Sequence, residues 1–172
     1  MPTTMEFKIG DRVVHPQQGV GYVVKLQERE FEPGVTRRYY EVAIPGSTVW
    51  VPMDLSISGL RKLAERSGIA RCRKILEAHP APLSEDPRFR QSELAARMKE
   101  GKITVQCEVV RDLYAHGEFR SLNGTIGTFY KAAREVLCQE WAAVEGVTLG
   151  EAAQEIDTLL EKSRIALKEA KT

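Results

Sequence analysis

The spacing of apolar residues changes near residue 57, and this change limits the possible folds more than any other feature of the sequence. Before it, apolar residues alternate with polar ones or form short β-branched runs, which is typical of strands. After it, apolar residues recur every three or four positions, which is typical of amphipathic helices. We therefore predict an α+β protein, with a β-domain over 1–57 and an all-α helical domain over 58–172.

The predicted strands of the first part are short and separated by turn residues. Pro33-Gly34 and Pro45-Gly46 are turn dipeptides. Pro16 ends the first strand because it cannot donate to a ladder, whereas Gly19 and Gly21 allow a positive φ or a close backbone approach. The first strand is expected to begin near Arg12, and the others to cover 20–26, 38–44 and 48–51. Short antiparallel strands of this kind predict a small barrel of the SH3 or Tudor type.

The second part carries helix signals in succession. We expect helices at about 58–66, 68–79, 86–100, 103–115, 124–145 and 148–169. Ser67 is the expected cap of the second helix, and Asp86-Pro87 has the form of a cap followed by proline at the first helical position. Thr148 and Glu151 form a capping box at the start of the last helix.

The sequence contains none of the usual catalytic patterns. Its three histidines are scattered, and its three cysteines form no CxxC pair, so buried thiols are expected rather than a disulfide framework or a zinc site. Phosphate-binding and nucleophile-elbow motifs are also missing. We predict a non-enzyme without cofactor, metal or small-molecule substrate. Because no apolar run could span a bilayer and no secretory signal is found, we also expect a cytoplasmic protein without a membrane partner.

The charge is unevenly distributed although the formal net charge is only +1. Residues 58–115 contain 12 Lys and Arg against 8 Asp and Glu, which gives +4 for the middle of the chain (12 − 8). Such an excess favours a phosphate-facing surface, but solvated helices often show the same composition.

Three stretches of the chain resemble the CarD family of bacterial RNA polymerase regulators. FKIGDRVVHPQQGVGYV (Phe7–Val23) is similar to the start of these proteins and of the polymerase-interacting domain of the transcription-repair coupling factor. RYYEVAIPGSTVWVP (Arg38–Pro52) is similar to the strands that close this module, and EVVRDLYAHGEFRSL (Glu108–Leu122) to part of the helical domain. No helicase motor motif is present, so the resemblance is to the stand-alone CarD type.

The resemblance implies two binding partners. The β-domain would dock on the RNA polymerase β subunit, and the helical domain would contact promoter DNA at the upstream bubble edge, weakly and without sequence specificity, to favour the open complex. For docking we predict strand addition through Thr48, Val49, Trp50 and Val51. Arg29 matches an arginine that the family uses against the polymerase, whereas Trp50 replaces a second arginine. By alternation Trp50 lies on the opposite face from Val49 and Val51, although packing in the barrel core is the alternative.

For DNA, the family's tryptophan wedge is missing, because its position falls at Pro87 or a neighbour. Phe89 is the candidate replacement, since it points away from the buried side of its predicted helix and could enter the minor groove. The alternative is that Phe89 packs on the loop 81–83. The predicted DNA-binding residues are Arg88, Phe89, Arg90, Arg97, Lys99 and Lys102. A second hypothesis is an adapter that binds the polymerase or another protein and makes no DNA contact.

Overall fold

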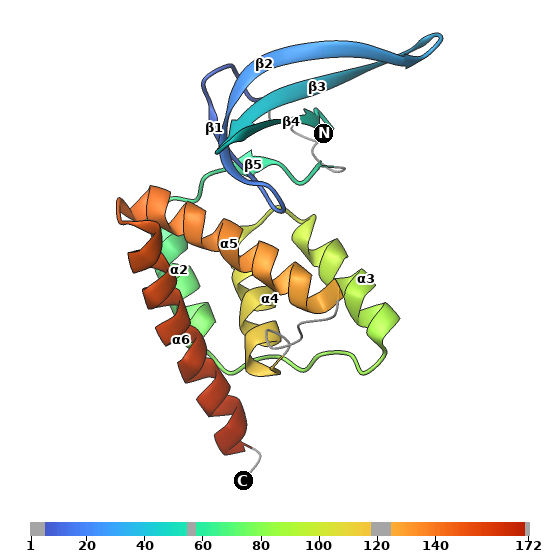
Figure 1. The fold of residues 1–172 in the computed structure, drawn as a ribbon. Helices are drawn as coiled ribbons and strands as arrows, with labels where there is room; N and C mark the ends of the chain where they lie inside the picture. The colour runs from blue at the N-terminus through green and yellow to red at the C-terminus, as the bar shows by residue number, and fades with distance from the viewer. Residues whose placement is uncertain (1–5, 55–57, 118–124, 171–172) are drawn as a thin grey trace.

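The computed structural model describes residues 6–54, 58–117 and 125–170 of the chain. An antiparallel sheet forms one end of the molecule and a cluster of helices forms the other (Figure 1). The predicted α+β class is therefore confirmed. The last part of the stretch Glu108–Leu122 lies outside the described residues, so its predicted polar loop is not compared with the structure.

The sheet has five strands in the order β4-β3-β2-β1-β5. Their bounds are Arg12–His15 (β1), Gly19–Glu32 (β2), Val35–Ile44 (β3), Ser47–Pro52 (β4) and Arg61–Lys62 (β5). The sheet is open, so the expected closure into an SH3- or Tudor-like barrel is not observed. β4 and β5 are its two edges, and β5 has only two residues. In addition, β2 and β3 continue past β4 as a two-stranded ribbon that projects from the molecule (Figure 1).

The turn between β1 and β2 brings the sheet against a helix. Gly19 has φ of +102°, and a Cβ atom at this position would lie 2.2 Å from Oε1 of Gln139. The same Gln139 oxygen accepts a hydrogen bond of 3.0 Å from the backbone N–H of Val20. A Cβ at Gly21 would lie 2.4 Å from the carbonyl oxygen of Ala43 on the neighbouring strand. Both predicted roles of these glycines, positive φ and close approach, are confirmed.

Five predicted helices are confirmed with shifts of a few residues at their ends. They are α2 (Arg66–Glu77), α3 (Pro87–Met98), α4 (Ile103–Ala115), α5 (Thr125–Glu145) and α6 (Leu149–Ala170). Asp86 caps α3 by accepting hydrogen bonds from the N–H groups of Arg88 and Phe89. Thr148 and Glu151 accept from each other's N–H groups, which is the predicted capping box.

The helix expected over 58–66 is wrong. Residues 59–65 contain no helix, and Arg61–Lys62 instead form β5, which pairs with Val13 and Val14 of β1. Ser67 is also not a cap, because α2 begins one residue earlier and its N-cap residue is Glu65. Pairing with β1 and an ion pair between Arg61 and a buried residue, described below, outweigh the local helical spacing.

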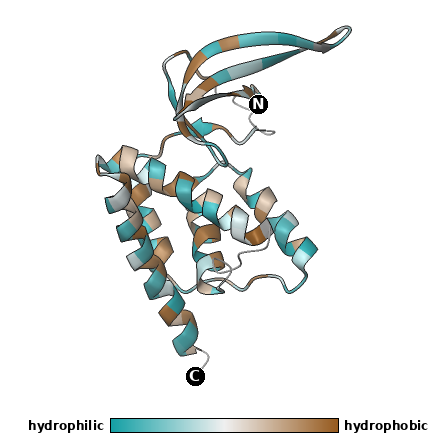
Figure 2. Cartoon of the chain, viewed as in Figure 1, coloured by the Kyte–Doolittle hydropathy of each residue, from teal (hydrophilic) through white to brown (hydrophobic). Residues whose placement is uncertain are grey.

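Two hydrophobic cores support the two parts. The larger one joins the helices around fully buried residues such as Leu113, Leu137 and Trp141. The smaller one lies under the sheet around Phe7, Tyr40 and Val42. The outward sides of α3 and α6 are largely hydrophilic (Figure 2). The three cysteines are free and buried, as expected, and burial raises the pKa of Cys138 to about 11.

Candidate functional site

The strand β4 has a free edge. It pairs with β3 through the register Glu41↔Trp50, and no other described strand pairs with it. Val51 is buried and Val49 packs against the sheet core, whereas Trp50 is 42% exposed. The predicted alternation is therefore confirmed, and Trp50 does not pack in the core. The backbone groups along the outer side of β4 are placed where an added strand could pair with them.

Arg29 of β2 meets Trp50 of β4 across the sheet. The guanidinium carbon of Arg29 lies 3.3 Å from the centroid of the Trp50 ring, which is a stacked cation–π contact. Nε of Arg29 also donates to Oε1 of Gln27 at 3.3 Å, and Nε2 of Gln27 donates to Glu41 at 3.4 Å. Two residues that the sequence predicted separately thus form one exposed surface, which we call the Arg29–Trp50 surface.

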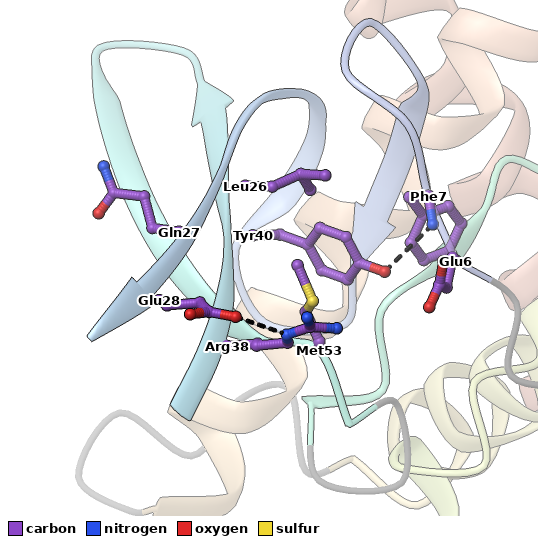
Figure 3. Close-up of a pocket in the computed structure, with 8 residues that line it drawn as sticks. All are labelled: Glu6, Phe7, Leu26, Gln27, Glu28, Arg38, Tyr40 and Met53. Atoms are coloured by element: carbon purple, nitrogen blue, oxygen red, sulfur yellow. Dashed lines mark hydrogen bonds and ion pairs between the residues drawn. The ribbon is translucent and has the colours of Figure 1, made fainter. Parts of the chain in front are cut away.

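A hollow of about 300 Å³ lies close to the end of β4 and was not predicted from the sequence. Figure 3 shows the ring of Tyr40 pointing toward Phe7, whose backbone N–H donates to the Tyr40 hydroxyl at 3.1 Å. Leu26 and Met53 add apolar surface, and an exposed ion pair of 3.0 Å joins Arg38 and Glu28.

The start of α3 presents an exposed aromatic ring beside cationic groups. Phe89 is 60% exposed, so its packing as a staple on the loop 81–83 is not observed. Arg88 is exposed as well, and Arg90 is half-buried. Arg88 makes no ion pair within the described residues. This part of the predicted DNA contact is therefore accessible.

Arg97 lies apart from these residues. Its guanidinium forms a 2.6 Å ion pair with Glu108 and lies 3.8 Å from buried Asp112, so it is directed toward α4. Lys99 and Lys102 are exposed in the connection between α3 and α4. The structure thus groups Arg88 with Phe89 at one end of α3 and the two lysines at the other end.

Two further cations next to Lys102 were not predicted. Lys62 of β5 and Arg71 of α2 line, together with Lys102, an open hollow of about 380 Å³ between the sheet and the helices. None of the three forms an ion pair within the part of the chain that the structure describes. Glu65 is the acidic residue in its lining. The excess of +4 in residues 58–115 was the signal for this surface, but the spacing alone could not locate it.

The last residue of β1 is a histidine that acts as a hydrogen-bond acceptor for the following turn. Nδ1 of His15 accepts hydrogen bonds of 3.1 Å from the backbone N–H groups of Gln17 and Gln18. Burial lowers the pKa of His15 below its ordinary value. The neutral ring therefore supports the turn that brings Gly19 against α5.

No group of three or more His, Cys, Asp or Glu residues in 6–54, 58–117 and 125–170 is placed to hold a metal ion. Within the same residues, no helix combines the length and the apolar character that a membrane span requires.

The molecule thus combines an open sheet that has a free edge with a group of helices that exposes cations. The family model for the CarD-like/TRCF RID domain matches residues 7–64, and the model for the CarD C-terminal domain matches residues 71–157. The chain therefore belongs to the CarD family of transcription factors. It is a transcription-related protein that interacts with RNA polymerase.

A curated relative covers both parts of the chain. It is described as "Putative transcription factor YdeB" from Bacillus subtilis (strain 168). The two proteins are 26% identical over 145 residues, which is 83% of this chain and 94% of the relative. The similarity thus extends through the sheet and the helices.

Proposed function

We propose that the protein docks on the RNA polymerase β subunit and contacts promoter DNA at the upstream bubble edge, where it stabilises the open complex. The observation that carries this proposal is the free edge of β4 with Arg29 stacked on the exposed ring of Trp50. The polymerase would supply a strand that pairs with the edge formed by Thr48, Val49, Trp50 and Val51. The stacked pair would add an aromatic anchor beside that strand.

The DNA contact would use the exposed ring of Phe89 and cations of the helical part and of β5. Phe89 would enter between base steps of the minor groove, with Arg88 and Arg90 at the flanking phosphates. Lys99 and Lys102, together with Lys62 and Arg71, would bind further along the backbone without reading the sequence. Arg97 is left out of this contact because its charge is already paired with Glu108.

The direct test is the half-life of open complexes formed by purified polymerase on a promoter fragment. The wild-type protein should lengthen this half-life, and Phe89→Ala should lose most of the effect while still being captured by the polymerase. The matched control is Ile165→Ala, which removes another exposed apolar side chain, on α6 and away from both proposed surfaces. If Phe89→Ala lengthens the half-life as much as the wild type does, insertion of the Phe89 ring into the DNA is excluded.

An adapter without DNA contact is the second candidate. It is favoured by the pairing of Arg97 within the helical part and by the absence of a tryptophan near the start of α3. Fluorescence anisotropy with a forked promoter fragment at two salt concentrations separates the two functions. Weak binding that falls as salt rises supports the DNA contact. No binding below about 100 μM, roughly the weaker end of ordinary non-specific affinity, supports the adapter.

A further inference from the structure

We infer that Arg61 and Glu140 form a positioning pair that holds the sheet and the helices at one fixed angle. A chain docked through β4 would then present Phe89 and the cations at one place relative to the polymerase. The inference rests on the proposed function, because it explains how two separate surfaces reach their partners together. The main observation behind it is a buried ion pair that crosses the junction between the sheet and the helices.

The pair joins an edge strand to the C-terminal half of a long helix. Arg61 lies in β5, opposite Val14 of β1, and Glu140 is a fully buried residue of α5. Both terminal nitrogens of Arg61 donate to the carboxylate, from Nη1 to Oε2 and from Nη2 to Oε1, at 2.6 Å each. Such a two-pronged contact fixes the direction of the guanidinium as well as its distance.

The same groups are tied to the neighbouring elements. Oε2 of Glu140 accepts a 2.8 Å hydrogen bond from the backbone N–H of Ala64, in the connection to α2. Nη2 of Arg61 also donates to Oε1 of Gln106 on α4 at 3.2 Å. Gln106 in turn donates from Nε2 to the carbonyl oxygen of Ala133 at 3.0 Å. The pair therefore belongs to a network that fixes β5, the connection, α4 and α5 together.

A second contact prevents rotation about the first. The residue before Glu140, Gln139, accepts a hydrogen bond from Val20 at the start of β2. β2 and β5 lie on opposite sides of β1 in the sheet. The helix is thus attached to the sheet on both sides of β1, and a hinge about this strand would break one of the two contacts.

A fixed angle matters because the DNA contact is weak. When two binding surfaces are linked, the second one gains from a high effective concentration only if the link places it at its target. A loose junction would spread the helices over many positions and lower this concentration. Loss of the pair should therefore leave docking intact and reduce the effect on the open complex.

The test variant replaces both partners by apolar residues. Arg61→Met with Glu140→Leu removes the directional contact without leaving one buried charge alone, which is the change most harmful to folding. The control is Arg134→Met with Asp157→Leu. Arg134 also lies on α5 and makes a two-pronged contact with Asp157, at 3.0 and 2.7 Å, but this pair joins α5 to α6 and not to the sheet.

The first measurement is the distance distribution between spin labels at Arg37→Cys on β3 and Ser92→Cys on α3, both exposed. The native cysteines are buried and should stay unlabelled. Wild type and control should give a narrow distribution, and the test variant one about twice as broad or more, because a loose link samples more positions. Arg61→Lys, which keeps the charge but offers no planar fork, is the second variant and should give an intermediate width.

The second measurement is the open-complex half-life with unlabelled proteins, alongside capture of polymerase. The test variant should lose most of the wild-type effect, on the order of tenfold in effective concentration, with capture changed less than about twofold. A distribution as narrow as wild type in both Arg61 variants overturns the inference. So does a broad distribution with an unchanged half-life. If the wild type itself does not lengthen the half-life, the proposed function fails, while the distance distributions still decide whether the pair fixes the angle.

Discussion

The two edges of the sheet differ in how far the protein itself engages them. β4 has no strand partner on its outer side among the described strands and exposes Trp50, whereas β5 consists of two residues and is fastened to α5 through Arg61. An open edge strand can pair with other chains and cause aggregation unless it is short, covered or occupied by a binding partner. Here one edge is short and engaged with the protein's own helices, and the other is free for a partner. The sheet is thus attached to the helices at one edge and open at the other.

Breaking the attached edge should have the largest effect. Glu140→Ala leaves the nearly buried guanidinium of Arg61 without its carboxylate, so we expect a loss of about 3–5 kcal/mol in the free energy of unfolding. The control Asp157→Ala removes a half-exposed partner of Arg134 and should cost less than about 1 kcal/mol. Urea unfolding followed by circular dichroism measures both. Equal losses would show that the buried pair is no more important than a surface one.

Altering the free edge should affect binding rather than stability. Trp50→Ala removes the ring under Arg29 and should weaken polymerase capture by about 2 kcal/mol, the size of an interface hot spot. The control is Tyr22→Ala, whose ring lies 5.7 Å from the guanidinium of Arg12 elsewhere on the sheet. Affinity for immobilised polymerase is the measurement. A Trp50→Ala variant that binds like the control would remove this surface from the interface.

The contact of α5 with the turn between β1 and β2 can be probed at Gly19. Gly19→Ala should destabilise the protein by about 1–2 kcal/mol or more, because alanine disfavours a positive φ and the new methyl group displaces Gln139 from Val20. Gly34→Ala is a matched control, since Gly34 has φ of +83° with nothing within 4 Å of the added Cβ. The difference between their unfolding free energies isolates the contact with α5. No difference would mean that this contact adds little.

The smallest effect should come from the histidine in the same turn. Because burial lowers the pKa of His15, the folded state binds the proton less readily than the unfolded state. The stability that the neutral ring provides is therefore present above the ordinary histidine pKa of about 6.5 and is lost as the pH falls below it. Urea titrations at about pH 7.5 and about pH 5.5, on either side of that pKa, should show a larger loss for wild type than for His15→Asn. Identical losses would exclude His15 as the source.

The sequence predicted the elements better than their assembly. The change of apolar spacing placed five helices to within a few residues, because it reports which side of each element is buried. The strands expected over 20–26 and 38–44 are longer in the structure, where β2 covers Gly19–Glu32 and β3 covers Val35–Ile44. The helix prediction for residues 59–65 was wrong because the pairing of Arg61–Lys62 with β1 outweighs a weak local helix signal. Barrel closure failed because strand number and length do not determine whether the edges meet. The prediction for the turn glycines was correct, because few other residues fit where the backbone lies so close to its neighbours.

The candidate site shows the same limit. Alternation along β4 correctly placed Trp50 on the exposed side, since this follows from one strand alone. The stack of Arg29 on Trp50 and the gathering of Lys62 and Arg71 beside Lys102 depend on how distant segments meet. The pairing of Arg97 with Glu108 also depends on the packing of α3 on α4, so its charge could not be classed as paired or free in advance.

The two-residue length of β5 also limits self-assembly. A filament of stacked copies needs two complementary sheet edges on each molecule. Every added copy then leaves one free edge to which the next copy can bind. β4 can accept a single foreign strand, or β4 of a second copy in a closed pair, but β5 is too short to continue the ladder on the other side. Recruitment through this sheet therefore ends after one partner.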